Sequence, residues 1–270
     1  MGGAVADDLI CVLGDANLDV VVCRSGPVAE ETDTDVRTWV GAGGQAASVA
    51  AWILALGGQA RLVAARGTDI AGGLVAAELA RRGVEVLGPV VEGRTGVVVS
   101  LSDRGATRSM RTDRGVGPQL TAAALRERWL AGAARLHLPA YSLVSAPIRA
   151  AALAAADQVP NVSVDLSSTA GLREFGVKRF RDLLARLRPD IVFGNEAEAD
   201  LVGDLPGADL VVKLGASGIR ARGAVHQALP TRAVDATGAG DAFAAGYLLG
   251  GVSLGLQAAA RAVARMGAMP

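Results

Sequence analysis

The chain has 270 residues, of which 27 are basic and 27 acidic, so its formal net charge is zero. Aromatic residues make up 3% of the sequence and hydrophobic residues 51%. A neutral chain does not attract a phosphodiester backbone, and few aromatic rings are present on which bases could stack. Nucleic-acid binding is therefore not expected, and the sequence favours a small-molecule partner.

Two features of the N-terminal region favour a cytoplasmic protein. Cys11 and Cys23 are too few to form a disulfide framework in a chain of this length. Met1–Asp8 carries two acidic residues and lacks the basic region with which secretory signals begin. We therefore expect no translocation.

One apolar segment, Ala242–Ala260, has 19 residues without a charge, close to the length that spans a bilayer. Gly250 and Gly251, followed by Ser253, instead predict a helix end, a turn and a new N-cap. We expect two buried helices here and no contact with a membrane.

Apolar runs of strand length alternate with alanine-rich helical stretches through most of the chain. This pattern predicts an α/β fold with a doubly wound, mostly parallel sheet flanked by helices. In chain order the predicted core elements are strand Leu9–Leu13, helix Gly44–Leu56, strand Arg61–Ala65, helix Ala71–Arg82, helix Thr121–Ala131, strand Arg135–Leu138, helix Ala146–Ala156, strand Val162–Asp165, helix Val177–Leu187, strand Ile191–Phe193, strand Leu210–Leu214 and helix Ala239–Leu249.

Two pairs of segments alternate polar and apolar residues and are not followed by a helix, which suits a sheet with one solvent-exposed face. The first pair is Leu18–Arg24 with Thr34–Val40, and the second is Thr95–Leu101 with Thr107–Thr112. We predict that they form a small β-sheet lid, within residues 15–40 and 94–112, over a pocket of one domain that spans residues 1–270. The lid is the candidate surface for a homodimer.

The motif with the most specific chemistry is Ala-Val-Asp-Ala-Thr-Gly-Ala-Gly-Asp-Ala-Phe at 233–243. Gly238, Ala239 and Gly240 lead into a predicted helix, with Asp241 in its first turn. Small residues let a ligand approach the backbone, and the N–H groups and positive dipole end of a helix start hold phosphate oxygens. Asp241 would then lie beside a transferring phosphoryl group. The alternative is that Asp241 only stabilises the helix start.

Four other segments follow predicted strands or open predicted helices. They are Gly-Asp-Ala-Asn-Leu-Asp at 14–19, Gly-Ala-Gly-Gly-Gln-Ala-Ala-Ser at 41–48, Gly-Asn-Glu-Ala-Glu at 194–198 and Gly-Ala-Ser-Gly-Ile at 215–219. Asn195 and Glu198 are three residues apart, which places them on one helical face. Open α/β sheets bind ligands at the carboxyl edge of their strands, so we expect these segments to meet there.

These five segments, in this order, resemble the ribokinase-like, or PfkB, carbohydrate kinase family over essentially the whole chain. The pattern from Asp235 to Asp241 is similar to the C-terminal signature of that family. Gly43-Gly44 with Leu56-Gly57 resembles its N-terminal signature, and the segment at 67–72 resembles its Gly-x-Asp-x-x-Gly element.

The resemblance implies an ATP-dependent kinase that phosphorylates a primary hydroxyl of a sugar or sugar derivative. A nucleoside kinase and a non-catalytic sugar-binding relative are the alternatives. Asp241 would be the general base, with Gly238, Ala239 and Gly240 as the anion hole. By the same resemblance the acceptor would be held by Asn17, Asp19, Gly43, Gly44, Gln45 and Ser48, ATP by Asn195, Lys213, Gly215, Ser217 and Gly218, Mg²⁺ by Glu198 through water, and a monovalent cation by Asp235.

Elementary chemistry agrees with part of this assignment. Phosphoryl transfer needs positioning and charge stabilisation more than covalent chemistry, so an anion hole, a metal ion and one carboxylate suffice. Asp19 could accept two hydroxyl hydrogen bonds from a sugar, although a turn-forming role is the alternative. For Asn195 and Glu198 the alternative is helix capping.

The sequence also departs from the ribokinase pattern. Residues 43–48 read Gly-Gly-Gln-Ala-Ala-Ser where ribokinases have Gly-Gly-Lys-Gly-Ala-Asn, and Leu138 is followed by Pro-Ala-Tyr where they offer a Glu. Ribose is therefore not the expected acceptor. Leu256 stands about where many members have Asn or His near the adenine, and the stretch before Pro270 predicts an incomplete cation loop.

One rival interpretation is a dinucleotide-dependent oxidoreductase, because Gly41, Gly43 and Ala46 formally fit the Rossmann fingerprint. That fingerprint should follow a buried strand, whereas residues 32–39 are polar and alternating. The sequence has no Gly-Lys-Ser/Thr phosphate loop, and the isolated His137 and His226 do not predict a metal site.

Overall fold

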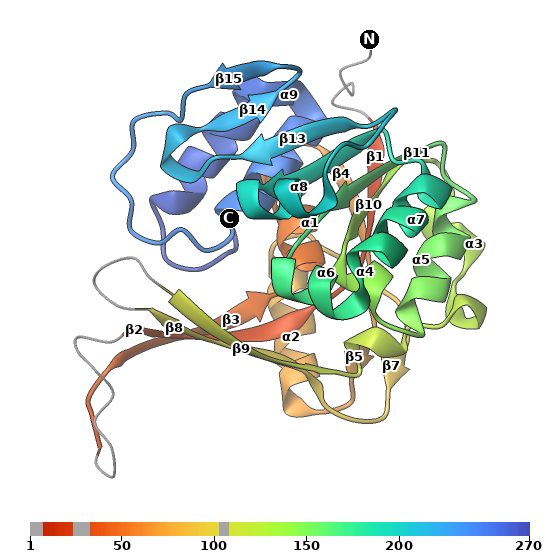
Figure 1. The fold of residues 1–270 in the computed structure, drawn as a ribbon. Coiled ribbons are helices and arrows are strands. Elements are labelled where there is room, and N and C mark those ends of the chain that lie inside the picture. Colours follow the sequence, from red (N-terminus) through yellow and green to blue (C-terminus); the bar gives the residue numbers. More distant parts are fainter. Residues whose placement is uncertain (1–7, 24–32, 103–107) are drawn as a thin grey trace.

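The computed structural model describes residues 8–23, 33–102 and 108–270 and has a main sheet of nine strands (Figure 1). The strands are parallel except for the last two of the chain, which form an antiparallel hairpin at one edge. In spatial order they are β15 (Ala224–His226), β14 (Ile219–Ala221), β13 (Asp209–Lys213), β12 (Ile191–Asn195), β11 (Asn161–Asp165), β10 (Ala133–Pro139), β1 (Leu9–Leu13), β4 (Gln59–Val63) and β6 (Val86–Leu87). The six predicted core strands are confirmed, with ends shifted by up to two residues.

Helices cover both faces of this sheet (Figure 1). Ile10 and Val12 of β1 belong to one buried cluster, and Cys11 and Leu13 belong to the other, as the alternation of a strand requires. The first cluster includes side chains of α1 (Gln45–Ala55), α2 (Ile70–Arg81) and α9 (Ala239–Val263), and the second includes those of α3 (Glu127–Leu130), α4 (Tyr141–Val144), α5 (Ile148–Ala156), α6 (Thr169–Phe175), α7 (Val177–Leu187) and α8 (Glu196–Val202).

The predicted second sheet is present and lies apart from the main sheet (Figure 1). Its strands, in the order β3-β2-β8-β9, are β3 (Arg37–Gly43), β2 (Asn17–Cys23), β8 (Thr95–Ser102) and β9 (Arg108–Gly115). Of the segments predicted for the lid, Arg24 and Thr107 lie outside the described residues. A third pairing joins β5 (Arg66–Gly67) to β7 (Val90–Val91).

The prediction of a helix over Thr121–Ala131 is wrong. Thr121 caps only a 3₁₀ turn, Ala122–Ala124, after which Leu125 is extended and α3 forms a single short turn. The extended step lets Leu125, Trp129 and Leu130 all reach the second buried cluster. Packing therefore overrides the helix propensity of the alanines.

The glycines at 41–43 are the end of β3 rather than a turn. Gly44, with a φ of 93°, makes the turn into α1, and a Cβ there would lie 2.9 Å from the carbonyl oxygen of Asp15. Because β3 is a lid strand with an exposed first half, the buried strand that a Rossmann fingerprint requires does not precede Gly41.

Among the described residues, α9 is the one helix long and apolar enough to cross a membrane by length and composition. Its most apolar window is 56% buried, and it packs against α1 within the first cluster. Gly250 and Gly251 leave helical geometry, so the predicted break is confirmed.

Candidate active site

A cavity of about 270 Å³ lies between the lid and the carboxyl edge of the main sheet. At this edge β1 and β10 are neighbours although far apart in the chain, which is the switch point where open α/β sheets bind ligands. The predicted site residues that line the cavity are Asn17, Asp19, Gly44, Gln45, Ser48, Asn195, Glu198, Lys213, Gly238, Gly240 and Asp241. The structure thus brings five of the six predicted acceptor residues, together with Gly238 and Gly240 of the predicted anion hole, to one space, whereas Gly43 and Ala239 do not line it.

Asp19 lies within β2, so it does not form a turn, and it is 9% exposed. Gly43 does not line the cavity but makes room for this carboxylate, because a Cβ at Gly43 would lie 2.0 Å from Cγ of Asp19. Burial, followed by the charge of Asp15, raises the pKa of Asp19 to about 7. Carboxyl groups with pKa values shifted in this way concentrate at functional sites.

Two buried atoms of the cavity wall lack a hydrogen-bond partner within the described part of the chain: Oδ1 of Asp19 and Oγ of Ser48. An unsatisfied buried polar atom costs about 1–3 kcal/mol, so native proteins rarely retain one without a reason. A ligand with hydroxyl groups would satisfy both atoms.

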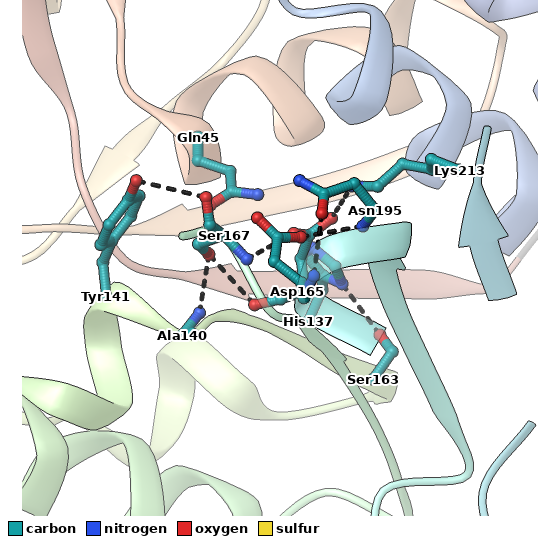
Figure 2. A network of polar contacts seen from close by, with 10 residues as sticks. Gln45, His137, Ala140, Tyr141, Ser163, Asp165, Ser167, Asn195 and Lys213 are labelled. Carbon is teal, nitrogen blue, oxygen red and sulfur yellow. Dashed lines mark hydrogen bonds and ion pairs between the residues drawn. The ribbon is translucent and has the colours of Figure 1, made fainter. Parts of the chain in front are cut away.

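Ser167 connects three elements along the floor of the cavity (Figure 2). Its hydroxyl donates to Oε1 of Gln45 over 2.6 Å and accepts from the N–H of Ala140 over 3.0 Å, and Tyr141 donates to its carbonyl over 3.4 Å. Its φ of 64° is unusual for a residue other than glycine. Such strain is found where a side chain is held for function.

Lys213 and Asp165 form an ion pair beside this network (Figure 2). Nζ of Lys213 lies 2.7 Å from Oδ2 of Asp165, whose side chain is 1% exposed. Burial opposes the charge of Lys213, but Asp165 raises the pKa of the amine above its usual value, so the group stays cationic. His137, near this ion pair, is fully buried, and desolvation lowers its pKa to about 4. Its Nδ1 forms a hydrogen bond with the hydroxyl of Ser163, so it is a local hydrogen-bonding residue, as predicted.

Asn195 and Glu198 form a complete capping box at the start of α8. Each side chain bonds the backbone N–H of the other over 2.9 Å. Asn195 and Glu198 therefore do cap the helix, as the alternative interpretation predicted, and both also line the cavity. Glu198 is 4% exposed, and desolvation raises the pKa of its carboxyl.

The predicted anion hole lies at the N-terminus of α9. Gly238 adopts a φ of 74°, and a Cβ there would lie 2.6 Å from the backbone of Ala268, so the turn requires glycine. Asp241 is in the first helical turn, where N–H groups lack intrahelical partners and the dipole favours anions. Asp241 is half-buried and its charge acts on Lys213.

A second cavity of about 490 Å³ adjoins the first and is mostly apolar. Lys213 and Gly240 line both cavities, and a Cβ at Gly240 would lie 3.2 Å from Nζ of Lys213. Of the predicted ATP-binding residues, Lys213, Gly215 and Gly218 line it, as do Ala239 of the predicted anion hole and Leu256. Ser217 is exposed and lines neither of the two cavities.

Asp235 lines neither of these cavities and binds the backbone instead. Its Oδ1 accepts from the N–H and hydroxyl of Thr237, and its Oδ2 accepts from the N–H of Gly267 over 3.0 Å. Ala268 in turn accepts from the indole N–H of Trp52 over 2.9 Å. Asp235 thus ties the last residues of the chain to the loop before α9.

Sequence reasoning gave no site role to several residues of the main cavity, among them Arg114, Tyr141, Asp165 and Ser167. Asp165 could have been found, because it is the polar end of an apolar strand that reaches the carboxyl edge. Arg114 and Ser167 belong to no motif, since their place depends on the pairing of β9 and on an unusual backbone angle.

Comparison with known proteins agrees with this geometry. A family model described as pfkB family carbohydrate kinase matches residues 7–269. The ATP-dependent ribose-1-phosphate kinase of Halopiger xanaduensis is 31% identical over 221 residues, which are 76% of this chain and 72% of that protein.

Solved structures are similar over nearly the whole chain. Adenosine kinase from Sinorhizobium meliloti gives a TM-score of 0.86 at 22% identity, covering 97% of this chain and 95% of its own. Ribokinase from Thermotoga maritima gives a TM-score of 0.78 at 22% identity, covering 97% of this chain and 96% of its own. The fold is therefore the ribokinase-like α/β fold.

Proposed function

Because this chain belongs to the pfkB family of carbohydrate kinases and is a phosphotransferase, we propose that it transfers the γ-phosphate of ATP to a primary hydroxyl of a sugar or sugar derivative. The observation that carries the proposal is the pair of adjoining cavities, one polar and one apolar, that share Lys213 and Gly240. The adenine and ribose of ATP fit the apolar cavity, and a polyol fits the polar one. The γ-phosphate would then lie at the junction.

Asp241 is the proposed general base. The positive end of α9 favours its ionised form, in which it accepts the proton of the acceptor hydroxyl. The hydroxyl oxygen forms a bond to the γ-phosphorus, the bond from that phosphorus to the bridging oxygen breaks, and ADP leaves with its electron pair. The N–H groups at Gly238–Asp241 and the cation of Lys213 stabilise the transferring phosphoryl group.

The residues present fit Mg²⁺ held largely by water and phosphate. Among the described residues no group of three or more His, Cys, Asp or Glu side chains could hold a metal ion. Mg²⁺ keeps several waters and is bound by one or two carboxylates plus the phosphates of its nucleotide. Glu198, one oxygen of which caps α8, is the proposed outer ligand, and Mg²⁺ would neutralise phosphate charge when bound.

Asn17, Asp19, Gln45 and Ser48 are the proposed acceptor contacts, supported by the unpartnered oxygens of Asp19 and Ser48. Tyr141 is the one aromatic side chain among the described residues that line the polar cavity, and the guanidinium of Arg114 covers its ring. A nucleoside base would need such a ring free for stacking. This favours a sugar over a nucleoside, and the activity of the Halopiger relative makes a sugar phosphate one acceptor to test.

The proposal is tested with purified protein, ATP and Mg²⁺ against pentoses, hexoses, their phosphates and nucleosides, with ADP release coupled to a spectrophotometric assay. Turnover of a sugar or sugar derivative supports it. Turnover of nucleosides alone would assign the nucleoside alternative, and sugar binding by calorimetry without any turnover would assign the non-catalytic alternative. Because Cys11 and Cys23 are free thiols, the assays should contain a reducing agent, which matches the cytoplasmic location that we propose.

A further inference from the structure

Arg114, on the lid, is a positively charged residue in the wall of the polar cavity, and the proposed phosphoryl transfer gives it no role. Met110, Thr112 and Arg114 alternate along β9 and line the cavity. Arg111 and Asp113, between them, are exposed and point to the other face of the lid. Arg114 is thus one of two positively charged residues in the described cavity wall, the other being Lys213.

The guanidinium of Arg114 is held in a fixed orientation. Its Cζ lies 3.9 Å from the centroid of the Tyr141 ring, and Tyr141 is itself anchored to the carbonyl of Ser167. Stacking of this kind occupies one face of the planar guanidinium and leaves the N–H groups along its edge available. Those edge donors match the oxygens of a phosphate or carboxylate in two parallel hydrogen bonds.

Arg114 has no carboxylate partner among the described residues, whereas Arg135 pairs with Asp190 at 2.7 Å and Arg94 with Asp113 at 3.2 Å. Asp15, an acid of the same part of the cavity, is already engaged. Its Oδ1 accepts from the N–H of Ala46 and its Oδ2 from the amide of Asn17, each over 3.1 Å. Among the described residues, therefore, no carboxylate forms an ion pair with Arg114.

The two cations come from different elements of the cavity wall, Arg114 from the lid strand β9 and Lys213 from the end of β13. Figure 2 shows Tyr141, on which Arg114 stacks, at one end of the polar network and Lys213 at the other, with Ser167 and Asp165 between them. Lys213 adjoins the anion hole through Gly240. A ligand that reaches from Tyr141 to Gly240 would therefore meet both cations, and Asp19 and Gln45 line the same cavity.

From this arrangement we infer that Arg114 binds a phosphate already present on the acceptor, so that the enzyme acts on a sugar monophosphate whose free primary hydroxyl points toward Asp241. The inference rests on the proposed function, because it concerns the acceptor of that same transfer. The phosphate bound at Arg114 is not transferred, and the product is a sugar bisphosphate. Asp15 and Asp19 also line this cavity and would repel a phosphate, so the phosphate would have to contact Arg114 directly.

The test compares three sugars that keep a primary hydroxyl, ribose 1-phosphate, fructose 1-phosphate and glucose 1-phosphate, each against its unphosphorylated parent. The proteins are wild type, Arg114→Gln, Arg114→Lys and, as the matched control from the other face of the same strand, Arg111→Gln. We expect wild type to prefer at least one phosphate over its parent by tenfold or more in kcat/KM. Arg114→Gln should raise KM for that phosphate about 10–100-fold and leave KM for ATP unchanged, since a charge-assisted bidentate contact is lost. Arg114→Lys should recover part of the affinity, and Arg111→Gln should behave as wild type.

Calorimetric binding of the same sugar phosphates without ATP separates this inference from the proposed function. Tight binding to wild type and weak binding to Arg114→Gln, with no turnover, would contradict the kinase proposal and leave the phosphate subsite standing. Turnover of parent sugars as fast as their phosphates would overturn the subsite and leave the kinase standing. Equal effects of Arg114→Gln on phosphates and parents, or no binding of any sugar phosphate to wild type, would also overturn the subsite.

Discussion

Nζ of Lys213 lies 2.7 Å from Oδ2 of Asp165, and this ion pair stands at the boundary between the polar and the apolar cavity. The carboxylate is almost fully buried and pairs with Lys213 alone among the residues that the structure describes, so the pair fixes the amine at the end of β13. The amine also adjoins Gly240, in the first turn of α9. Lys213 therefore has two roles: it neutralises the buried Asp165, and it supplies positive charge for the proposed transfer.

Replacing Lys213 by Met should separate these two roles. We expect kcat to fall roughly 10²–10³-fold because a preorganised cation at the phosphoryl group is lost. Stability should fall by about 3 kcal/mol because the buried carboxylate of Asp165 loses its ion-pair partner. Urea unfolding and steady-state kinetics measure the two effects. The double variant Asp165→Asn/Lys213→Met should regain most of the stability and none of the rate, and recovery of the rate would contradict the role given to Lys213.

Asp241→Asn keeps the shape of the side chain and removes the proton acceptor. General-base catalysis contributes about 10²–10⁴-fold, so kcat should fall by roughly that factor. KM for ATP should change little, because the backbone N–H groups remain. Glu127→Gln, which changes a first-turn acid of α3 outside the two cavities, is the control. A near-normal kcat for Asp241→Asn would sink the mechanism, and a variant that fails to fold would favour a capping role.

Asp19→Ala should raise KM for the acceptor far more than KM for ATP. The substitution removes a carboxylate that can accept two hydroxyl hydrogen bonds, and it leaves the apolar cavity untouched. Ribose should be a poor substrate or none, since the segment at 43–48 departs from the ribokinase pattern. Initial rates over a grid of both substrates give the two constants. A change in KM for ATP alone would exchange the assignments of the two cavities.

Asp19 should also make stability depend on pH. Its pKa is raised from 3.8 to about 7 in the fold, so the native state holds a proton that the unfolded chain releases near pH 4. Stability contributed by this proton is complete below about pH 4 and is lost as pH rises through about 7. Asp19→Asn cannot ionise and should therefore gain stability relative to wild type as pH goes from 5 to 8. Urea midpoints at those two pH values measure it, and a constant difference between the proteins would contradict the raised pKa.

Cations provide a further prediction. Mg²⁺ should be essential, because it neutralises the phosphates of ATP. Potassium should stimulate only weakly, since both carboxylate oxygens of Asp235 already accept hydrogen bonds from Thr237 and Gly267. Rates in potassium chloride and in a tetramethylammonium salt of equal ionic strength decide it. A large stimulation by potassium would mean that Asp235 and its loop still build a cation site.

The six core strands and most of the longer helices could be predicted in order, because each apolar run and each glycine-rich helix start is a local pattern, whereas β6, β14, β15, α4 and α6 were not predicted. The meeting of Asp19, Gln45 and Asp241 also followed, since parallel strands bring their carboxyl ends to one edge. The helix at Thr121–Ala131 could not be excluded from its alanines, because contacts of Trp129 with distant residues decide its shape.

Other parts of the site depend on pairing that one sequence does not encode locally. Gly43 lies against Asp19 because β2 and β3 pair in one register, and a shift by one residue would remove that contact. Arg114 enters the cavity for a similar reason, as the alternation of β9 alone leaves either face available. The position of the Ser167 side chain depends on a left-handed backbone conformation, which the sequence around Leu166 does not predict.

The position of Ala268 has a practical consequence for handling the protein. Ala268 lines the polar cavity and lies against Gly238. The carbonyl oxygen of Pro270 accepts a hydrogen bond from Arg82. Arg82 also binds Glu78, and Glu78 accepts a hydrogen bond from the backbone N–H of Ala42 in the lid strand β3. An affinity tag fused after Pro270 would therefore begin three residues after Ala268 of the cavity wall and near residues that bind the lid strand β3. Rates measured with a tag after Pro270 would therefore report on the tag as well as on the enzyme.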